Sequence, residues 1–174
     1  LNRVLVPPQT AIQGVTHVLP GRMYCFNPKN QELTWVQTQN IPNGPELYLS
    51  REEHRERIRY EISNAVKRRM VADVEVGVYL SGGIDSALVA AMMVEEGGRP
   101  KAFTVGFSDS TLDETARATS IANHLGIDHE VIRLGPDTFL DALDRSVVAF
   151  ENPVANTHGA AKNLLASLAS KKVK

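Results

Sequence analysis

The segment from residue 74 to residue 98 constrains the fold of this chain more than any other part of its sequence. Residues 74–80 are rich in β-branched side chains and are bounded by turn-forming residues, a composition typical of a buried parallel strand. A glycine pair follows at 82–83, and residues 85–96 then predict a helix that ends at a second glycine pair. A buried strand that turns directly into a helix is the repeating unit of a parallel sheet.

The chain beyond this segment continues the alternation of strand and helix. Capping-box pairs, Ser50 with Glu53 and Thr111 with Glu114, mark two helix starts, and a further strand is expected to begin at Lys172. The pattern predicts an α/β fold, a Rossmann-like parallel sheet with helices on both faces. The other predicted strands are 101–107 and 130–134, and the other predicted helices are 50–70, 111–126, 136–150 and 157–170.

The first part of the chain has a different texture, because proline, asparagine and glycine interrupt its short apolar runs. Residues 22–26 and 32–37 predict two strands joined by a tight turn, a short antiparallel hairpin. Two strands alone are marginally stable, so we expect this hairpin to pack against something else. A Pro-Asn-Gly-Pro cluster at 42–45 then marks a boundary. We therefore expect two domains, 1–45 and 46–174.

Composition and charge exclude several classes of protein. The chain has 19 basic and 20 acidic residues and a net charge of -1, so no strong field favours a nucleic-acid partner. No apolar run approaches the roughly 18–20 residues that a membrane span needs, and no secretory signal is visible. The lone cysteine, Cys25, suits a reducing compartment and is expected to be a small buried residue in a strand. These features predict a cytoplasmic protein without nucleic-acid or membrane partners.

Residues 81–86, Ser-Gly-Gly-Ile-Asp-Ser, carry the chemistry of the sequence. They lie between a predicted strand and helix, where open parallel sheets bind ligands. The glycines let backbone N–H groups approach a polyphosphate, and the helix N-terminus adds further N–H groups. Ser81 and Ser86 supply hydroxyl groups, and Asp85 is a hard oxygen ligand suited to Mg²⁺. Without a lysine the loop is not a Walker-type site, and an ordinary strand-to-helix turn is the structural alternative.

This loop resembles the SGGxDS motif with which ATP pyrophosphatases bind the pyrophosphate of ATP. Its flanks resemble the glutamine-hydrolysing asparagine synthetases, and the early stretch 14–21 is similar to the end of that family's glutaminase domain. The resemblance implies that residues 1–45 are the C-terminal remnant of a glutaminase domain and that 46–174 are a truncated ATP pyrophosphatase synthetase domain. The flanking blocks that carry it are residues 71–80 and 102–107, followed by Asp113, Glu114 and Ala116.

The resemblance also implies roles for individual residues. Asp85 would hold Mg²⁺, while the serines and glycines of the loop would hold the β- and γ-phosphates. Leu80 and Val105 would line the adenosine pocket with Gly106, although a place in a buried strand explains Leu80 and Val105 equally well. Glu151 would help to orient the acceptor substrate, or it is a loop carboxylate in solvent. The residues implied to bind ATP are Leu80, Ser81, Gly82, Gly83, Asp85, Ser86, Val105 and Gly106.

The reaction implied by the resemblance is ATP-dependent amide synthesis. A carboxylate, most simply that of L-aspartate, is adenylated with release of pyrophosphate, and glutamine-derived ammonia from a glutaminase domain of the same polypeptide then displaces AMP. A specialised relative that amidates or cyclises another carboxylate is the alternative, and a non-catalytic nucleotide-binding module is a second one. Other ATP pyrophosphatases, such as GMP and NAD synthetases, fit the loop but not the stretch 14–21.

The sequence departs from the family pattern at two places. Leu1 stands where a glutaminase needs an N-terminal cysteine nucleophile, and the family's second acidic loop would follow Lys174. We therefore expect these residues to be the middle of a longer polypeptide and to be inactive without the rest of it. The resemblance leaves room for a homodimer. Asp113 and Glu114 are either ligands or stabilisers of a helix N-terminus. His124 and His129 are expected to be surface or loop histidines.

Overall fold

The computed structural model describes residues 7–38, 48–108, 113–150 and 158–173. The main division of the chain into two compact units lies between Tyr48 and Leu49. None of the described helices is long and apolar enough to cross a membrane. The expected boundary at 42–45 lies outside the described residues, so the two-domain assignment, including the glutaminase origin of the first domain, stays a prediction.

The first unit contains the predicted hairpin. Strand β1 (Arg22–Asn27) pairs antiparallel with β2 (Glu32–Gln37), and the turn closes where the Lys29 N–H donates to Asn27 Oδ1 at 3.0 Å. The Arg22 guanidinium lies 3.7 Å from the centre of the Trp35 ring. Cys25 is exposed, so the expectation that it is buried is wrong, because a two-stranded ribbon has too few neighbours to cover both its faces.

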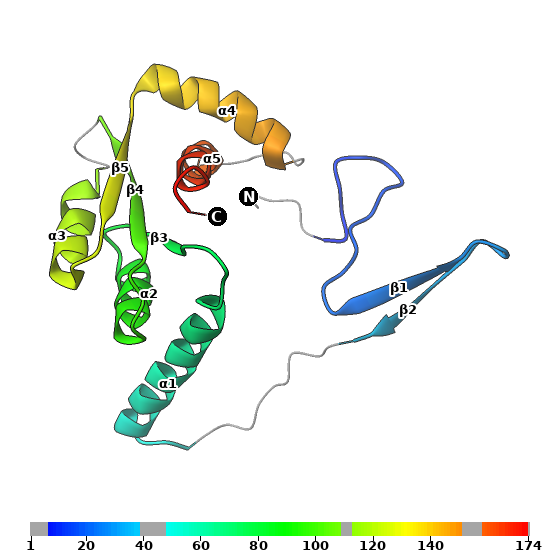
Figure 1. The fold of residues 1–174 in the computed structure, drawn as a ribbon. Coiled ribbons are helices and arrows are strands. Elements are labelled where there is room, and N and C mark those ends of the chain that lie inside the picture. The colour runs from blue at the N-terminus through cyan, green and yellow to red at the C-terminus, as the bar shows by residue number, and fades with distance from the viewer. Residues whose placement is uncertain (1–6, 39–47, 109–112, 151–157, 174) are drawn as a thin grey trace. The chain divides into compact units, whose positions relative to one another are not determined.

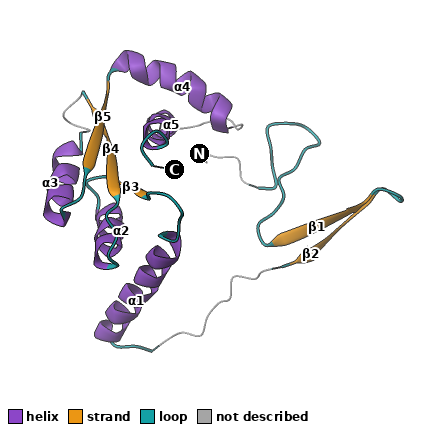
Figure 2. Cartoon of the chain, in the orientation of Figure 1, coloured by secondary structure: helices purple, strands orange, loops and turns teal. Residues whose placement is uncertain are grey.

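The second unit is a three-stranded parallel sheet with helices, and Figures 1 and 2 show the alternation. Its strands β3 (Gly77–Tyr79), β4 (Lys101–Phe107) and β5 (His129–Leu134) are ordered β3-β4-β5. Val78 pairs with Ala102, which in turn pairs with His129. The helices are α1 (Arg51–Arg69), α2 (Ile84–Glu95), α3 (Thr115–Leu125), α4 (Pro136–Phe150) and α5 (His158–Ala169).

Successive residues of the central strand β4 face opposite sides of the sheet, and helices cover both sides. Ala102 is fully buried in a cluster with Ala90 of α2 and Ala118 of α3. Phe103, the next residue, packs with Leu165 of α5 on the other side of the sheet (Figure 1). The predicted α/β fold, a parallel sheet with helices on both faces, is therefore confirmed.

Three predicted element boundaries are wrong. β3 has only three residues, because Val74 and Glu75 are exposed and the strand pairs with β4 alone within the described sheet. Helix α3 has Glu114, not Thr111, at its N-cap position, and Thr111 lies outside the described residues. No strand begins at Lys172, since its N–H bonds back to the Ala169 carbonyl oxygen at 2.9 Å and prolongs the end of α5 as a turn.

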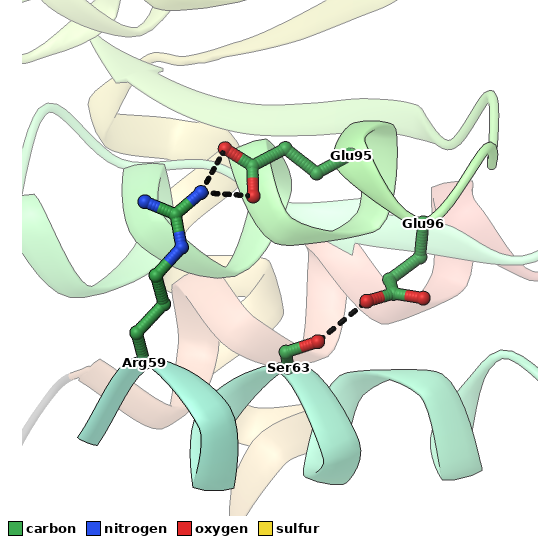
Figure 3. Close-up of polar contacts among 4 residues, drawn as sticks. All are labelled: Arg59, Ser63, Glu95 and Glu96. Atoms are coloured by element: carbon green, nitrogen blue, oxygen red, sulfur yellow. Dashed lines mark hydrogen bonds and ion pairs between the residues drawn. The ribbon is translucent and has the colours of Figure 1, made fainter. Parts of the chain in front are cut away.

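Helix α1 is anchored to the end of α2 by polar side chains (Figure 3). One nitrogen of the Arg59 guanidinium donates to both carboxylate oxygens of Glu95, at 3.1 and 2.9 Å. Ser63 donates to the Glu96 carboxylate, and Lys67 lies 3.3 Å from it. The hydrogen bond from Ser63, and then the Lys67 ammonium, hold the pKa of Glu96 below its ordinary value of 4.5. The predicted capping box of Ser50 and Glu53 also forms at the start of α1.

Candidate nucleotide-binding site

The loop of residues 81–83 joins the carboxyl end of the short strand β3 to helix α2. Gly83 is the N-cap residue, in extended conformation, and it offers no side chain to the helix. The Ala87 N–H makes an intrahelical bond, 3.2 Å from the Gly83 carbonyl oxygen. The N–H groups before it have no partner within the helix, and the positive end of the helix dipole lies with them. The loop thus presents backbone donors at a position that suits an anion.

Two serine hydroxyl groups close the loop on itself. Ser86 Oγ lies 2.9 Å from Ser81 Oγ and accepts a hydrogen bond from the Ser81 N–H at 3.1 Å. Ser81 Oγ in turn accepts from the Gly83 N–H at 3.3 Å. Ser86 is half-buried and Ser81 is exposed. Ser86 therefore holds the loop together from inside, while Ser81 faces the cavity at the end of the sheet. The sequence predicts hydroxyl donors at both positions, and the structure gives the two hydroxyl groups different surroundings.

A chain of hydrogen bonds fixes the residue before the loop. The buried Thr104 hydroxyl donates to the Leu80 carbonyl oxygen at 2.6 Å and lies 2.7 Å from His129 Nε2. Because the single hydroxyl proton points to Leu80, His129 Nε2 must carry a proton and donate to Thr104. Burial lowers the pKa of His129 below its ordinary value of 6.5. His129 is half-buried in strand β5, so the expectation that it is a surface or loop histidine is wrong. His124, by contrast, is exposed.

The loop packs against the start of helix α3, and Gly82 makes this packing close. A Cβ atom on Gly82 would lie 2.9 Å from Arg117 Cβ and 3.1 Å from Arg117 Cδ. The Gly82 N–H also donates to Glu114 Oε2 at 3.3 Å. Glycine is needed at position 82 for space, which sequence reasoning based on turn conformation did not identify.

The start of α3 also packs closely against strand β4, and Gly106 makes this second close approach possible. A Cβ atom on Gly106 would lie 2.6 Å from the Thr115 methyl group. Asp113 accepts hydrogen bonds from the Thr115 N–H at 3.2 Å and from its hydroxyl group at 2.8 Å. These bonds, with the Arg133 guanidinium 3.5 Å away, keep the pKa of Asp113 below its ordinary value of 3.8. Asp113 thus stabilises the helix start, whereas the carboxylate of Glu114 reaches the loop.

A cavity of about 320 Å³ opens at the carboxyl ends of β3 and β4, between the sheet and α5. Three residues proposed from sequence, Leu80, Ser81 and Val105, line it, while Gly106 is buried in β4. Sequence reasoning missed Thr104 and Lys162, although a polar residue inside an apolar strand was a signal for the first. The other lining residues are Tyr79, Phe103, Phe107, Glu114, His158, Ala161 and Leu165.

Asp85 lies in the first turn of α2 and is exposed. Within the described part of the chain its carboxylate has no hydrogen bond or ion pair, and no group of three acidic, histidine or cysteine side chains gathers anywhere. A single free carboxylate beside backbone donors for phosphate fits Mg²⁺, which takes one or two carboxylates together with substrate phosphates and water. Glu151 lies outside the described residues, so its role stays a prediction.

The family model described as asparagine synthase matches residues 57–174. The chain is 32% identical to "Amidase chyE" of Penicillium rubens over 91% of this chain and 26% of that protein. It is 29% identical to "Asparagine synthetase [glutamine-hydrolyzing] 1" of Bacillus subtilis over 86% of this chain and 23% of that protein. The chain thus spans about a quarter of the length of these relatives. A glutamine-dependent NAD⁺ synthetase from Acinetobacter baumannii aligns at 20% identity and a TM-score of 0.47, over 85% of this chain and 28% of that chain.

Proposed function

The chain belongs to the asparagine synthase family, and on that premise we propose that it is the ATP-binding part of an amide-forming synthetase. The observation that carries the proposal is the position of the loop 81–86 beside the cavity at the carboxyl ends of β3 and β4. In open parallel sheets that edge is where nucleotides bind. The loop's backbone donors and the apolar cavity next to it suit the two chemically different halves of ATP.

The binding roles follow from what each residue offers. Leu80 and Val105 line the cavity and would contact the adenosine, with Gly106 behind them letting β4 and α3 approach closely. The N–H groups of the first turn of α2 would receive the β- and γ-phosphates. Gly82 and Gly83 would join them by exchanging the hydrogen bonds that their N–H groups make to Glu114 and Ser81. Ser81 and Ser86 would shape the phosphate-binding loop. Asp85, whose carboxylate is free, would hold Mg²⁺.

The proposed reaction has two steps with balanced bonds. The acceptor carboxylate oxygen attacks the α-phosphorus, the bond to the bridging oxygen breaks, and pyrophosphate leaves with that electron pair. Ammonia then attacks the acyl carbon, loses a proton, and AMP leaves with the acyl-phosphate oxygen. Bound Mg²⁺ would offset charge on the phosphates. The protein residues contribute by holding the triphosphate in line and by donating N–H groups to the oxygens on which charge accumulates.

For the acceptor we propose L-aspartate, with ammonia from a glutaminase domain in the same polypeptide. The family description and the similarity to asparagine synthetases support this choice. A different carboxylate is the second candidate. The similarity to proteins named amidases in Penicillium rubens and Gibberella zeae, at 32% and 30% identity, favours it. A nucleotide-binding module without activity is disfavoured by the unaltered Ser-Gly-Gly-Ile-Asp-Ser loop.

The test is pyrophosphate release from ATP and Mg²⁺ by the full-length protein, with ammonium and a panel of carboxylates. We expect release that depends on one acid and falls about a hundredfold or more in Asp85→Ala, because Asp85 would hold the metal on the departing group. Asp73→Ala removes another exposed carboxylate, four residues before β3 and so at its opposite end, and should leave the rate unchanged.

The acid that supports release separates the alternatives. Dependence on L-aspartate supports asparagine synthesis, and dependence on another acid supports the specialised enzyme. ATP binding without release for any acid would contradict the enzymatic proposal and favour the binding module.

A further inference from the structure

The phosphate end of the proposed site lacks a positively charged side chain within its own loop. Residues 81–86 contain no lysine or arginine, and their only charged group is the carboxylate of Asp85. The departing pyrophosphate carries several negative charges, of which one Mg²⁺ offsets two. Arginine and lysine are common partners of the backbone donors at sites that bind or release such groups. A cationic side chain at this site would therefore come from another element.

Arg117 lies against the loop from the first turns of helix α3. Its Cβ and Cδ atoms would be 2.9 and 3.1 Å from a Cβ atom on Gly82, so the aliphatic part of the side chain runs across this glycine. Any larger residue at position 82 would displace it. The absence of a side chain on Gly82 thus brings Arg117 to the loop whose N–H groups face the phosphates.

The charge of Arg117 is unused by the fold. The side chain is exposed, and within the described part of the chain the guanidinium has no hydrogen bond or ion pair. Arg133, by contrast, lies 3.5 Å from Asp113. Arg117 lies one helical turn after Glu114. The Glu114 carboxylate accepts a hydrogen bond from the Gly82 N–H at 3.3 Å and places a negative charge beside the loop. A cation here offsets that charge and attracts an anionic ligand.

We propose that Arg117 is a binding residue for the β- and γ-phosphates of ATP and for the pyrophosphate product. Its guanidinium presents several N–H donors in a fixed plane, a geometry that matches phosphate oxygens. The inference rests on the proposed function, since it takes the loop to be the phosphate site. It adds a residue from α3 to a phosphate site otherwise built from the loop and α2, and it gives the close packing of Gly82 on Arg117 a purpose in binding.

The test measures binding rather than turnover, by calorimetry on the full-length protein with ATP, inorganic pyrophosphate and adenosine, the first two with Mg²⁺. Arg117→Met keeps an unbranched apolar stem over Gly82 and removes the charge, whereas Arg117→Lys keeps the charge without the planar fork. Arg99→Met is the matched control. It removes the same charge beyond the far end of α2, a 12-residue helix that is about 18 Å long.

We expect Arg117→Met to weaken the binding of ATP and of pyrophosphate about tenfold to a hundredfold, because this is the usual effect of losing hydrogen bonds to a charged group. Adenosine should bind as before, Arg117→Lys should recover part of the affinity, and Arg99→Met should match the wild type. Pyrophosphate affinity should also fall less steeply with salt in Arg117→Met, because one cation fewer takes part.

Two results contradict the inference in distinguishable ways. Equal pyrophosphate and ATP affinities in the wild type and Arg117→Met overturn the role of Arg117 and leave the proposed function standing. A wild-type protein that binds neither ATP nor pyrophosphate overturns the proposed function, and the inference falls with it. Equal loss of adenosine and pyrophosphate binding in Arg117→Met would assign Arg117 a structural role and would also overturn the proposal.

Discussion

At the scale of single residues, Gly82 and Gly83 are neighbours with different reasons to be glycine. A Cβ atom on Gly82 would lie within 3.1 Å of two Arg117 carbons, whereas one on Gly83 would meet only Ser81 Oγ at 3.3 Å. Gly83 is extended, with φ of -87°, so its backbone tolerates a side chain. The pair that looks uniform in the sequence therefore combines one packing requirement with one more tolerant position.

Gly82→Ala is expected to push the loop and α3 apart. Overpacking of this kind costs about 1–3 kcal/mol of folding free energy, so the thermal midpoint should fall and ATP binding should weaken. The control is Gly135→Ala, because nothing lies within 4 Å of the added methyl group and the backbone there needs no left-handed conformation. Thermal unfolding and ATP titration of both variants check this, and a Gly82→Ala protein as stable as Gly135→Ala would contradict it.

At the scale of elements, one of the polar contacts between α1 and the end of α2 depends on an ionised Glu96. The pKa of its carboxyl is below 4.5 in the folded protein, chiefly because Ser63 donates a hydrogen bond to it. The unfolded chain therefore binds this proton first as the pH falls. The contribution of Glu96 to stability is complete above pH 4.5 and is lost as the pH falls through the lower, folded-state pKa.

Glu96→Gln and Ser63→Ala should each flatten the fall of stability with pH below about 4.5, relative to the wild type. Urea unfolding followed between about pH 3 and pH 6 measures this slope. Glu95→Gln is the matched control, since it removes a neighbouring carboxylate whose partner is Arg59 and leaves the Ser63 bond intact (Figure 3). The same pH dependence in wild type and Glu96→Gln would show that another group controls acid stability.

At the scale of the whole second unit, the cavity exists because α5 lies on one face of the sheet. Leu165 on α5 is 8% exposed, packs with Phe103 and Ala169, and forms part of the cavity wall. Helix α5 thereby closes the side of the proposed nucleotide site that the loop leaves open. Lys162, one turn earlier, is the lysine of this wall.

Leu165→Ala should destabilise the second unit by about 2–5 kcal/mol, because it removes buried contacts on this face of the sheet. Leu140→Ala on α4, where the side chain is 61% exposed, should change stability by less than about 0.5 kcal/mol. Hydrogen exchange of the β4 amides separates the two, since only the first variant should speed their exchange. Unchanged exchange in Leu165→Ala would mean that α5 does not support the sheet.

The sequence by itself determined the features whose signals are local. The loop 81–86, the alternation of strands and helices, the capping box at Ser50 and the end of α3 at Gly126, with φ of 65°, were all readable because a few adjacent residues set the backbone there. The family resemblance rested on the same local blocks and was confirmed by the family match.

Only the tertiary structure decided what depends on residues far apart in the chain. The predicted strand 74–80 is longer than the observed β3, because hydrogen-bonding neighbours, and not composition, decide where a strand begins. Thr104 meets His129 because the parallel register of β4 and β5 pairs His129 with Ala102, two residues before Thr104 on the same strand. Gly82 meets Arg117 because α3 packs on the loop. Residues 25 to 35 positions apart come together through sheet register and helix packing, which no local pattern encodes.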